Sequence, residues 1–365
     1  MDFSSFNESG KRQKFKIQCT EGRNKLTFSQ LKFKLQTRKP CTPLNNAHPA
    51  GFSLFFYSKT IDMNKKPYIK PPLSLEDQAL LLLKRGLKGI SKEELVKILS
   101  HISYYRLRGY TYPYQNNSEP DSPFLQNSRW EYIWNDYVFD SKLTNLITEA
   151  LGHIEVAIRT QLALEMSLEY GSRWYADPAL CHNKRCFEEN LKELQEHWER
   201  SREVFKKHYE KEYDNSYLPP AWMILETTTF GTVSKVYSNI SNNISAKIRI
   251  AEYFGFRKAS VKVLASWLQH LNLVRNICAH YSRLFSRSFI VRPMLPTTKP
   301  KKWVSSIPAQ DRIYVSICII TYFLDICAPE FDFRKKLRVA MNMARKTQFP
   351  SMGFPINWEK ESLFN

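Results

Sequence analysis

Glycine is scarce in this chain, and two sequence patterns of common cofactor-binding folds are missing. Only 11 of the 365 residues are glycine, too few for a β architecture with many tight turns. Neither glycine-rich phosphate-binding pattern, GxGxxG or GxxxxGK[ST], occurs in the sequence. We therefore expect no nucleotide-type cofactor, and the sequence gives no sign of any other.

Long apolar runs are also missing. The longest, Ile313 to Cys327, has 15 residues and contains Ser316, Thr321 and Asp325, whereas a membrane-spanning helix needs roughly 20. We interpret it as a buried core helix. The N-terminus has no apolar segment of the kind found in a signal peptide. These observations predict a cytoplasmic protein without a membrane partner.

The cysteines are few, odd in number and scattered. The seven lie at positions 19, 41, 181, 186, 278, 318 and 327, a distribution that favours free thiols in a reducing compartment over a disulfide framework. Cys181, His182 and Cys186 form the one local cluster, which offers at most three ligands and has no second CxxC pair. We expect no metal site.

Acidic residues are outnumbered by basic ones, 35 to 54, and the formal net charge is +19. This charge favours polyanionic partners, either nucleic acid or an anionic membrane surface, and does not choose between them. A solvated basic surface without a ligand is the alternative.

Charge and periodicity divide the chain into four predicted parts. Residues 1–62 hold 11 basic and 4 acidic residues, a net charge of +7, and have no sustained period, which predicts a disordered extension. Because Met63 begins a segment that looks like a natural protein start, the extension is either an over-extended reading of the gene or a basic arm for nucleic acid. An N-terminal helical subdomain at 63–128, a helical domain at 129–348 and a C-terminal tail at 349–365 are predicted to follow.

Helix signals dominate after residue 70. Capping-box patterns begin at Ser74 and Ser91, and we expect Gly86 and Gly109 to end the helices that follow them. Further helices are predicted at 130–170, 187–212, 244–254, 259–286, 308–327 and 331–347. No segment reads as a strand, so the predicted fold class is all-α, a helical bundle.

Two groups outside the main motif are candidates for a supporting or RNA-binding role. Tyr104, Tyr105 and Arg106 could stack on bases, although aromatic residues of this kind more often pack within the protein. Glu155 and Arg159 are four residues apart, which fits a simple ion pair on a helix surface. Gly231 is expected to let two helices approach closely.

An Arg-x(4–6)-His pattern, which marks a class of helical ribonucleases, occurs twice. About 1.4 matches are expected by chance, so the pattern alone carries little information. Arg202 and His208 lie in a highly charged segment where a glutamate competes for the arginine, and we interpret this match as accidental.

Arg275 and His280 have a different context, because their segment is mostly apolar with a helical period. Asn276 shares a helix face with His280, and Asn272 and Arg283 extend the polar stripe. Polar groups on a buried helix need partners, so the stripe favours a functional cluster. A structural histidine bonded to a nearby carbonyl is the alternative.

These residue types suit metal-independent RNA cleavage. Histidine can take the 2′-hydroxyl proton or protonate the leaving oxygen, arginine can hold phosphorane oxygens, and asparagine can orient the phosphate or the imidazole. One histidine cannot easily be both base and acid, so we expect a homodimer that combines two motifs in one site.

The chain resembles the Abi family of bacterial abortive-infection proteins, specifically its AbiD/AbiF-like group. The matching segments are 70–74, 102–110, 139–143, 154–159, 220–226, 230–232 and 275–280. The resemblance implies a HEPN-type bundle and a toxin of phage defence that cleaves RNA. The family's Arg-Asn-x-x-x-His motif corresponds to Arg275, Asn276 and His280, and the family segment around Glu155 and Arg159 implies support for that site.

Some family members are restrained by an RNA or protein antitoxin. The resemblance implies that this chain has such an antitoxin too. A non-catalytic RNA-binding or regulatory module is the second hypothesis, because it needs the same basic surface. Membrane action is a third and weaker one.

Overall fold

The computed structural model describes residues 2–6, 12–16, 70–214, 218–257, 260–296, 300 and 302–365. The chain forms two compact units, Met1–Pro72 and Leu73–Asn365. Most of the predicted 1–62 extension lies outside the described residues, and the four-part division of the chain stays a prediction.

The described part of the first unit is a pair of short strands. Strand β1 (Asp2–Phe6) pairs antiparallel with β2 (Arg12–Lys16), with Ser4 opposite Lys14. The expectation that the chain has no strand was wrong here. These five-residue runs contain none of the β-branched residues by which strands are recognised.

The second unit is helical, which confirms the predicted fold class. Its α-helices within the described residues are α1 (Leu75–Lys84), α2 (Lys92–Leu99), α3 (Tyr104–Thr111), α4 (Trp130–Tyr170), α5 (Lys184–Arg200), α6 (Val204–Glu212), α7 (Ala221–Ile224), α8 (Phe230–Asn239), α9 (Ser245–Tyr253), α10 (Val261–Ala279), α11 (Ile313–Cys327) and α12 (Phe333–Met341).

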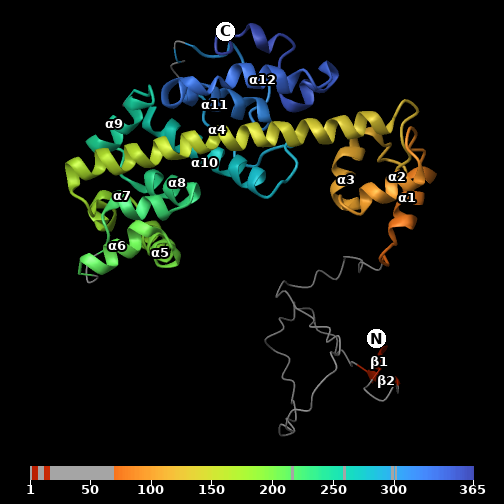
Figure 1. The fold of residues 1–365 in the computed structure, drawn as a ribbon, viewed down its shortest axis with the longest axis horizontal. Coiled ribbons are helices and arrows are strands. Elements are labelled where there is room, and N and C mark those ends of the chain that lie inside the picture. Colours follow the sequence, from red (N-terminus) through yellow and green to blue (C-terminus); the bar gives the residue numbers. More distant parts are fainter. Residues whose placement is uncertain are drawn as a thin grey trace, which may run out of the picture. The chain divides into compact units, whose positions relative to one another are not determined.

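Helix α4 organises the second unit (Figure 1). Its 41 residues span about 60 Å at 1.5 Å per residue. Helix α3 contacts its N-terminal part, α7, α8 and α9 contact its C-terminal part, and α10, α11 and α12 pack along it. Each of these helices is therefore positioned by the same element.

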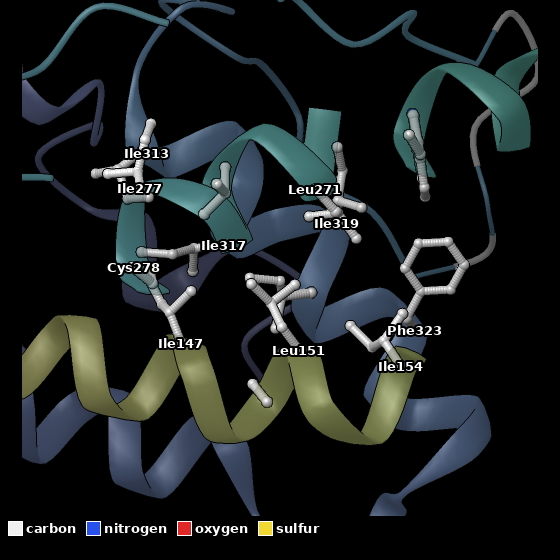
Figure 2. Packing of buried hydrophobic residues seen from close by; sticks show 14 of the residues in the cluster. Ile147, Leu151, Ile154, Leu271, Ile277, Cys278, Ile313, Ile317, Ile319 and Phe323 are labelled. Atoms are coloured by element: carbon white, nitrogen blue, oxygen red, sulfur yellow. The ribbon is translucent and has the colours of Figure 1, made fainter. Parts of the chain in front are cut away.

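A central part of the core lies where α10 and α11 meet α4 (Figure 2). Ile147, Leu151 and Ile154 of α4 face Leu271 and Ile277 of α10, and α11 closes this core with Ile313, Ile317, Ile319 and Phe323. Burying each such side chain stabilises the fold by roughly 1.5–3 kcal/mol. The C-terminal half of α10 is thus anchored through its apolar face.

Helix α11 is the apolar run noted in the sequence, and residues 313–324 are all buried. This confirms the predicted core helix. Among the described residues no single helix is long and apolar enough to span a membrane, and α11 with α12 passes that test only as a pair bent by 119°.

Several predicted helix boundaries were wrong. The helix predicted at 308–327 begins at Ile313, and the one predicted at 331–347 is Phe333–Met341. The helix that starts after Ser91 ends at Leu99, and Gly109 lies inside the next helix, α3, instead of ending one. The predicted helix 187–212 is two helices, α5 and α6, separated at Ser201–Glu203. The chain turns there so that Tyr209 packs against Trp198, with their ring centroids 5.9 Å apart.

Candidate functional site at the end of helix α10

Helix α10 ends earlier than its sequence predicts, at Ala279 rather than near residue 286. The N–H of Tyr281 donates to the carbonyl of Cys278 at 2.8 Å, and the N–H of Ser282 donates to that of Ile277 at 2.9 Å. This pair of bonds is the Schellman motif, which normally has glycine at the position of Tyr281. Because no glycine or proline occurs there, the sequence pattern did not show the helix end.

The three predicted catalytic residues lie together at this helix end. Arg275 is half-buried, whereas Asn276 and His280 are exposed. His280 is the C-cap residue, and its N–H donates to the carbonyl of Asn276 at 3.1 Å. Within the described part of the chain, no hydrogen bond or ion pair engages the three side chains. They are held by a fixed backbone and remain available to a ligand.

The predicted polar stripe needs correction, because the helix does not continue to Arg283. Asn272 and Asn276 lie on α10, and His280 caps it. Asn272 faces Gly231 of α8: a methyl group built on this glycine would lie 3.1 Å from Oδ1 of Asn272. The predicted close approach of two helices at Gly231 is therefore confirmed, between α8 and α10.

The Glu155–Arg159 pair joins α4 to the turn before α8. Both side chains are largely buried, 15% and 12% exposed, so the pair is not a simple surface ion pair. The guanidinium also donates to the carbonyl of Thr228 at 2.8 Å and lies 3.6 Å from the carboxylate of Glu226. The turn leads directly into α8, whose Gly231 touches Asn272. Two contacts thus link the predicted supporting pair to α10.

Asp140 holds the segment that follows His280, and its role was missed in the sequence. Its carboxylate accepts hydrogen bonds from the hydroxyl of Tyr110 at 2.6 Å and from the N–H groups of Phe285 at 2.7 Å and Leu284 at 3.2 Å. Only 2% of Asp140 is exposed. Burial raises the pKa of Asp140, and the three donors oppose that shift. The nearby carboxylate adds to burial in raising the pKa of Tyr110.

Arg283 forms a second link, to α3. Its guanidinium donates to the carbonyl of Gly109 at 2.8 Å, and its stem lies over this glycine, where a side chain would be 3.5 Å from Cδ. Burial lowers the pKa of Arg283, and the carboxylate of Asp140 opposes this shift. Arg283 thus fixes the turn after α10 and lies near Asp140.

The aromatic-arginine segment of α3 is largely engaged in packing. Tyr104 accepts a hydrogen bond from Arg85 at 2.6 Å, and the guanidinium of Arg106 lies 6.0 Å from the ring centroid of Tyr137. Tyr105, by contrast, is 87% exposed. Of this segment, Tyr105 is the residue most open to a ligand.

A periodic signal for Asp140 was present in the sequence. Ile133, Asp136, Asp140, Leu143 and Ile147 recur at three- and four-residue spacing and are all buried. An acid within such a stripe requires buried donors. Asp136 follows the same rule, because it accepts hydrogen bonds from Tyr114 and Gln348.

The remaining features add no further candidate centre. The described cysteines 181, 186, 278, 318 and 327 are free thiols. No group of three or more metal-ligating side chains occurs among the residues that the structure describes. A groove of about 900 Å³ between α4 and α12 is lined by Lys142, His153 and Lys336 among others and includes no predicted site residue.

Comparison with protein families gives a match. The family model described as "Abi-like protein" matches residues 97–286, more than half of the chain. This range begins in α2 and ends just after the turn that holds Tyr281 and Arg283, so it includes every predicted site residue. No curated protein and no solved structure matches the chain.

Proposed function

The chain belongs to the Abi-like protein family, and on this premise we propose that it is an endoribonuclease toxin acting through Arg275, Asn276 and His280. Family membership indicates abortive infection, a form of phage defence, as the setting. The proposal adds RNA as substrate, cleavage by protein side chains without a metal ion, and the AbiD/AbiF-like and HEPN assignments.

The observation that carries the proposal is the lack of bonding partners for these three side chains among the described residues. An arginine, an asparagine and a histidine lie within six residues at one helix end, and none is engaged within the described residues. By contrast, the side chains of Asp140 and Arg283 bond to backbone groups. A fixed backbone that carries free polar groups is what a catalytic site needs.

The chemistry follows from the residue types. His280 accepts the proton of a ribose 2′-hydroxyl, and the oxygen forms a bond to the adjacent phosphorus. Arg275 stabilises the added negative charge on the phosphorane oxygens, and Asn276 orients the phosphate. The bond from phosphorus to the 5′-oxygen then breaks, and this oxygen takes up a proton. The products are a 2′,3′-cyclic phosphate end and a 5′-hydroxyl end.

Protonation of the leaving oxygen needs a second acid, since His280 holds the first proton in the forward step. A second copy of the chain would supply another His280, so a homodimer with a composite site is part of the proposal. An RNA or protein antitoxin that covers the site and a cytoplasmic location complete it.

The test compares RNA cleavage and growth arrest for the wild type and His280→Ala, with EDTA present. We expect His280→Ala to cleave at least about 100-fold more slowly. The matched control is His208→Ala, which removes an exposed histidine from the accidental match on α6 and should leave both readouts unchanged. Equal cleavage and equal toxicity of the wild type and His280→Ala would refute the assignment.

A non-catalytic RNA-binding module is the second candidate, favoured by the 87% exposed Tyr105 and the net charge of +19. It predicts binding that weakens steeply with salt and RNA that is recovered intact. The recovered RNA length therefore separates the two functions.

A further inference from the structure

Tyr281 is a bulky residue in a backbone conformation that favours glycine. Its φ is +48°, in the left-handed region where a Cβ atom crowds the following carbonyl oxygen. The residue after a helix C-cap is most often glycine or asparagine, because these residues tolerate that region. A tyrosine at this position is therefore not explained by the needs of the turn.

The rest of the unit holds this strained turn in place. The N–H groups of Leu284 and Phe285 donate to the buried carboxylate of Asp140, and Arg283 donates to the carbonyl of Gly109. The turn is thus bonded to α10, α4 and α3. A side chain on so constrained a backbone needs little ordering when it binds a ligand.

The ring of Tyr281 is open to a ligand. It is 63% exposed, and among the described residues no ring contact or side-chain hydrogen bond engages it. It directly follows His280. Arg275, whose guanidinium has no bonding partner among the described residues, belongs to the same helix end. An exposed aromatic ring at the same helix end as an arginine suits single-stranded RNA, whose bases stack on rings while a guanidinium holds the phosphate.

We propose that Tyr281 is a base-stacking residue that binds an unpaired nucleobase next to the RNA bond cut at His280. The substrate class is single-stranded RNA, because the faces of bases in a duplex are covered by their neighbours. This inference rests on the proposed function and assigns a binding role to a residue outside the Arg-Asn-x-x-x-His motif.

The test measures binding of a fluorescent single-stranded oligonucleotide of 2′-O-methyl RNA, which the proposed chemistry cannot cleave because its 2′-oxygens carry no proton. Tyr281→Phe keeps the ring, whereas Tyr281→Asn and Tyr281→Gly remove it and suit the left-handed backbone. We expect Tyr281→Phe to bind like the wild type. The other two variants should bind about tenfold more weakly, with thermal unfolding temperatures no lower than that of the wild type.

An oligonucleotide series with one abasic position at a time sharpens the test. For the wild type, one abasic position should weaken binding about tenfold. For Tyr281→Asn, the same position should make little difference, because the ring and the base would act as a pair. A base-paired hairpin should bind more weakly than the single strand.

Each result has a defined meaning. Wild-type binding by Tyr281→Asn and Tyr281→Gly, or equal weakening in Tyr281→Phe, overturns the stacking role and leaves RNA cleavage by the wild type intact as evidence for the proposed function. If the wild type binds no single strand, the inference is overturned. If RNA also remains uncut, the proposed function is overturned with it.

Discussion

His270, one of the fully buried polar residues, should make the protein sensitive to mild acid. It lies on α10 ten residues before His280, and its Nδ1 and Nε2 atoms are each 2.7 Å from a partner, the carbonyl of Val291 and the hydroxyl of Ser316. A carbonyl can only accept, so Nδ1 carries the proton, and neutral Nε2 accepts from the serine. Both ring nitrogens are satisfied without a positive charge.

The expected size of the effect follows from the pKa. Burial lowers the pKa of His270 from 6.5 to about 4. The folded state therefore binds this proton less readily than the unfolded state, so stability is retained above pH 6.5 and lost as the pH falls from 6.5 towards 4. The loss is about 2 kcal/mol at pH 5 and approaches about 3 kcal/mol below pH 4.

The assay is urea unfolding, followed by circular dichroism, of the wild type and His270→Gln at pH 7.5 and pH 5. Glutamine can donate to the carbonyl and accept from the serine, yet it does not titrate. The difference in unfolding free energy between the two proteins should therefore change by about 2 kcal/mol between these pH values in favour of the variant. The control is His208→Gln, which changes an exposed histidine. If the two proteins lose stability in parallel with pH, the reasoning is refuted.

Three substitutions probe the contacts around the candidate site. Asp140→Ala leaves buried N–H groups without an acceptor and should destabilise the fold by about 3 kcal/mol; urea unfolding that matches the wild type would contradict this. Gly231→Val places atoms against Asn272 and should destabilise by about 1–3 kcal/mol, with a smaller effect expected for Gly231→Ala in the same measurement. Arg159→Met leaves the carboxylate of Glu155 buried without its partner and should lower stability by about 3 kcal/mol. If the double variant Arg159→Met/Glu155→Leu is more stable than Arg159→Met alone, the buried unpaired carboxylate is the cause. If it is no more stable, this cause is contradicted.

Local signals in the sequence identify many helices correctly. The predicted helix at 130–170 coincides with α4, and the capping box at Ser91 and Glu94 is formed as expected. Both features depend on residues close in sequence: a continuous apolar face in one case and two side chains three residues apart in the other. The closeness of Arg275, Asn276 and His280 is also a local property, although the end of their helix at Ala279 was not predicted.

Two features that the prediction missed involve contacts between residues far apart in the chain. Gly109 looked like a helix stop but lies inside α3, where Arg283 packs over it from 174 residues away. The segment that follows the early end of α10 is held by bonds to Asp140, which is 144 residues from Leu284 in the chain. The periodicity of one sequence shows which residues are buried but not which distant residues they contact. The turn after α10 and the bonding partners of Asp140 could therefore not be derived from it.

The long separation between Asp140 and the turn has a consequence for synthesis of the protein. A ribosome that adds about 5–20 residues per second needs about 7–30 s to translate the 145 residues from Asp140 to Phe285. Until then the acceptor for the turn exists without its donors, and the groups around His280 have no fixed geometry. Any activity that depends on His280 is therefore delayed until this part of the chain has left the ribosome.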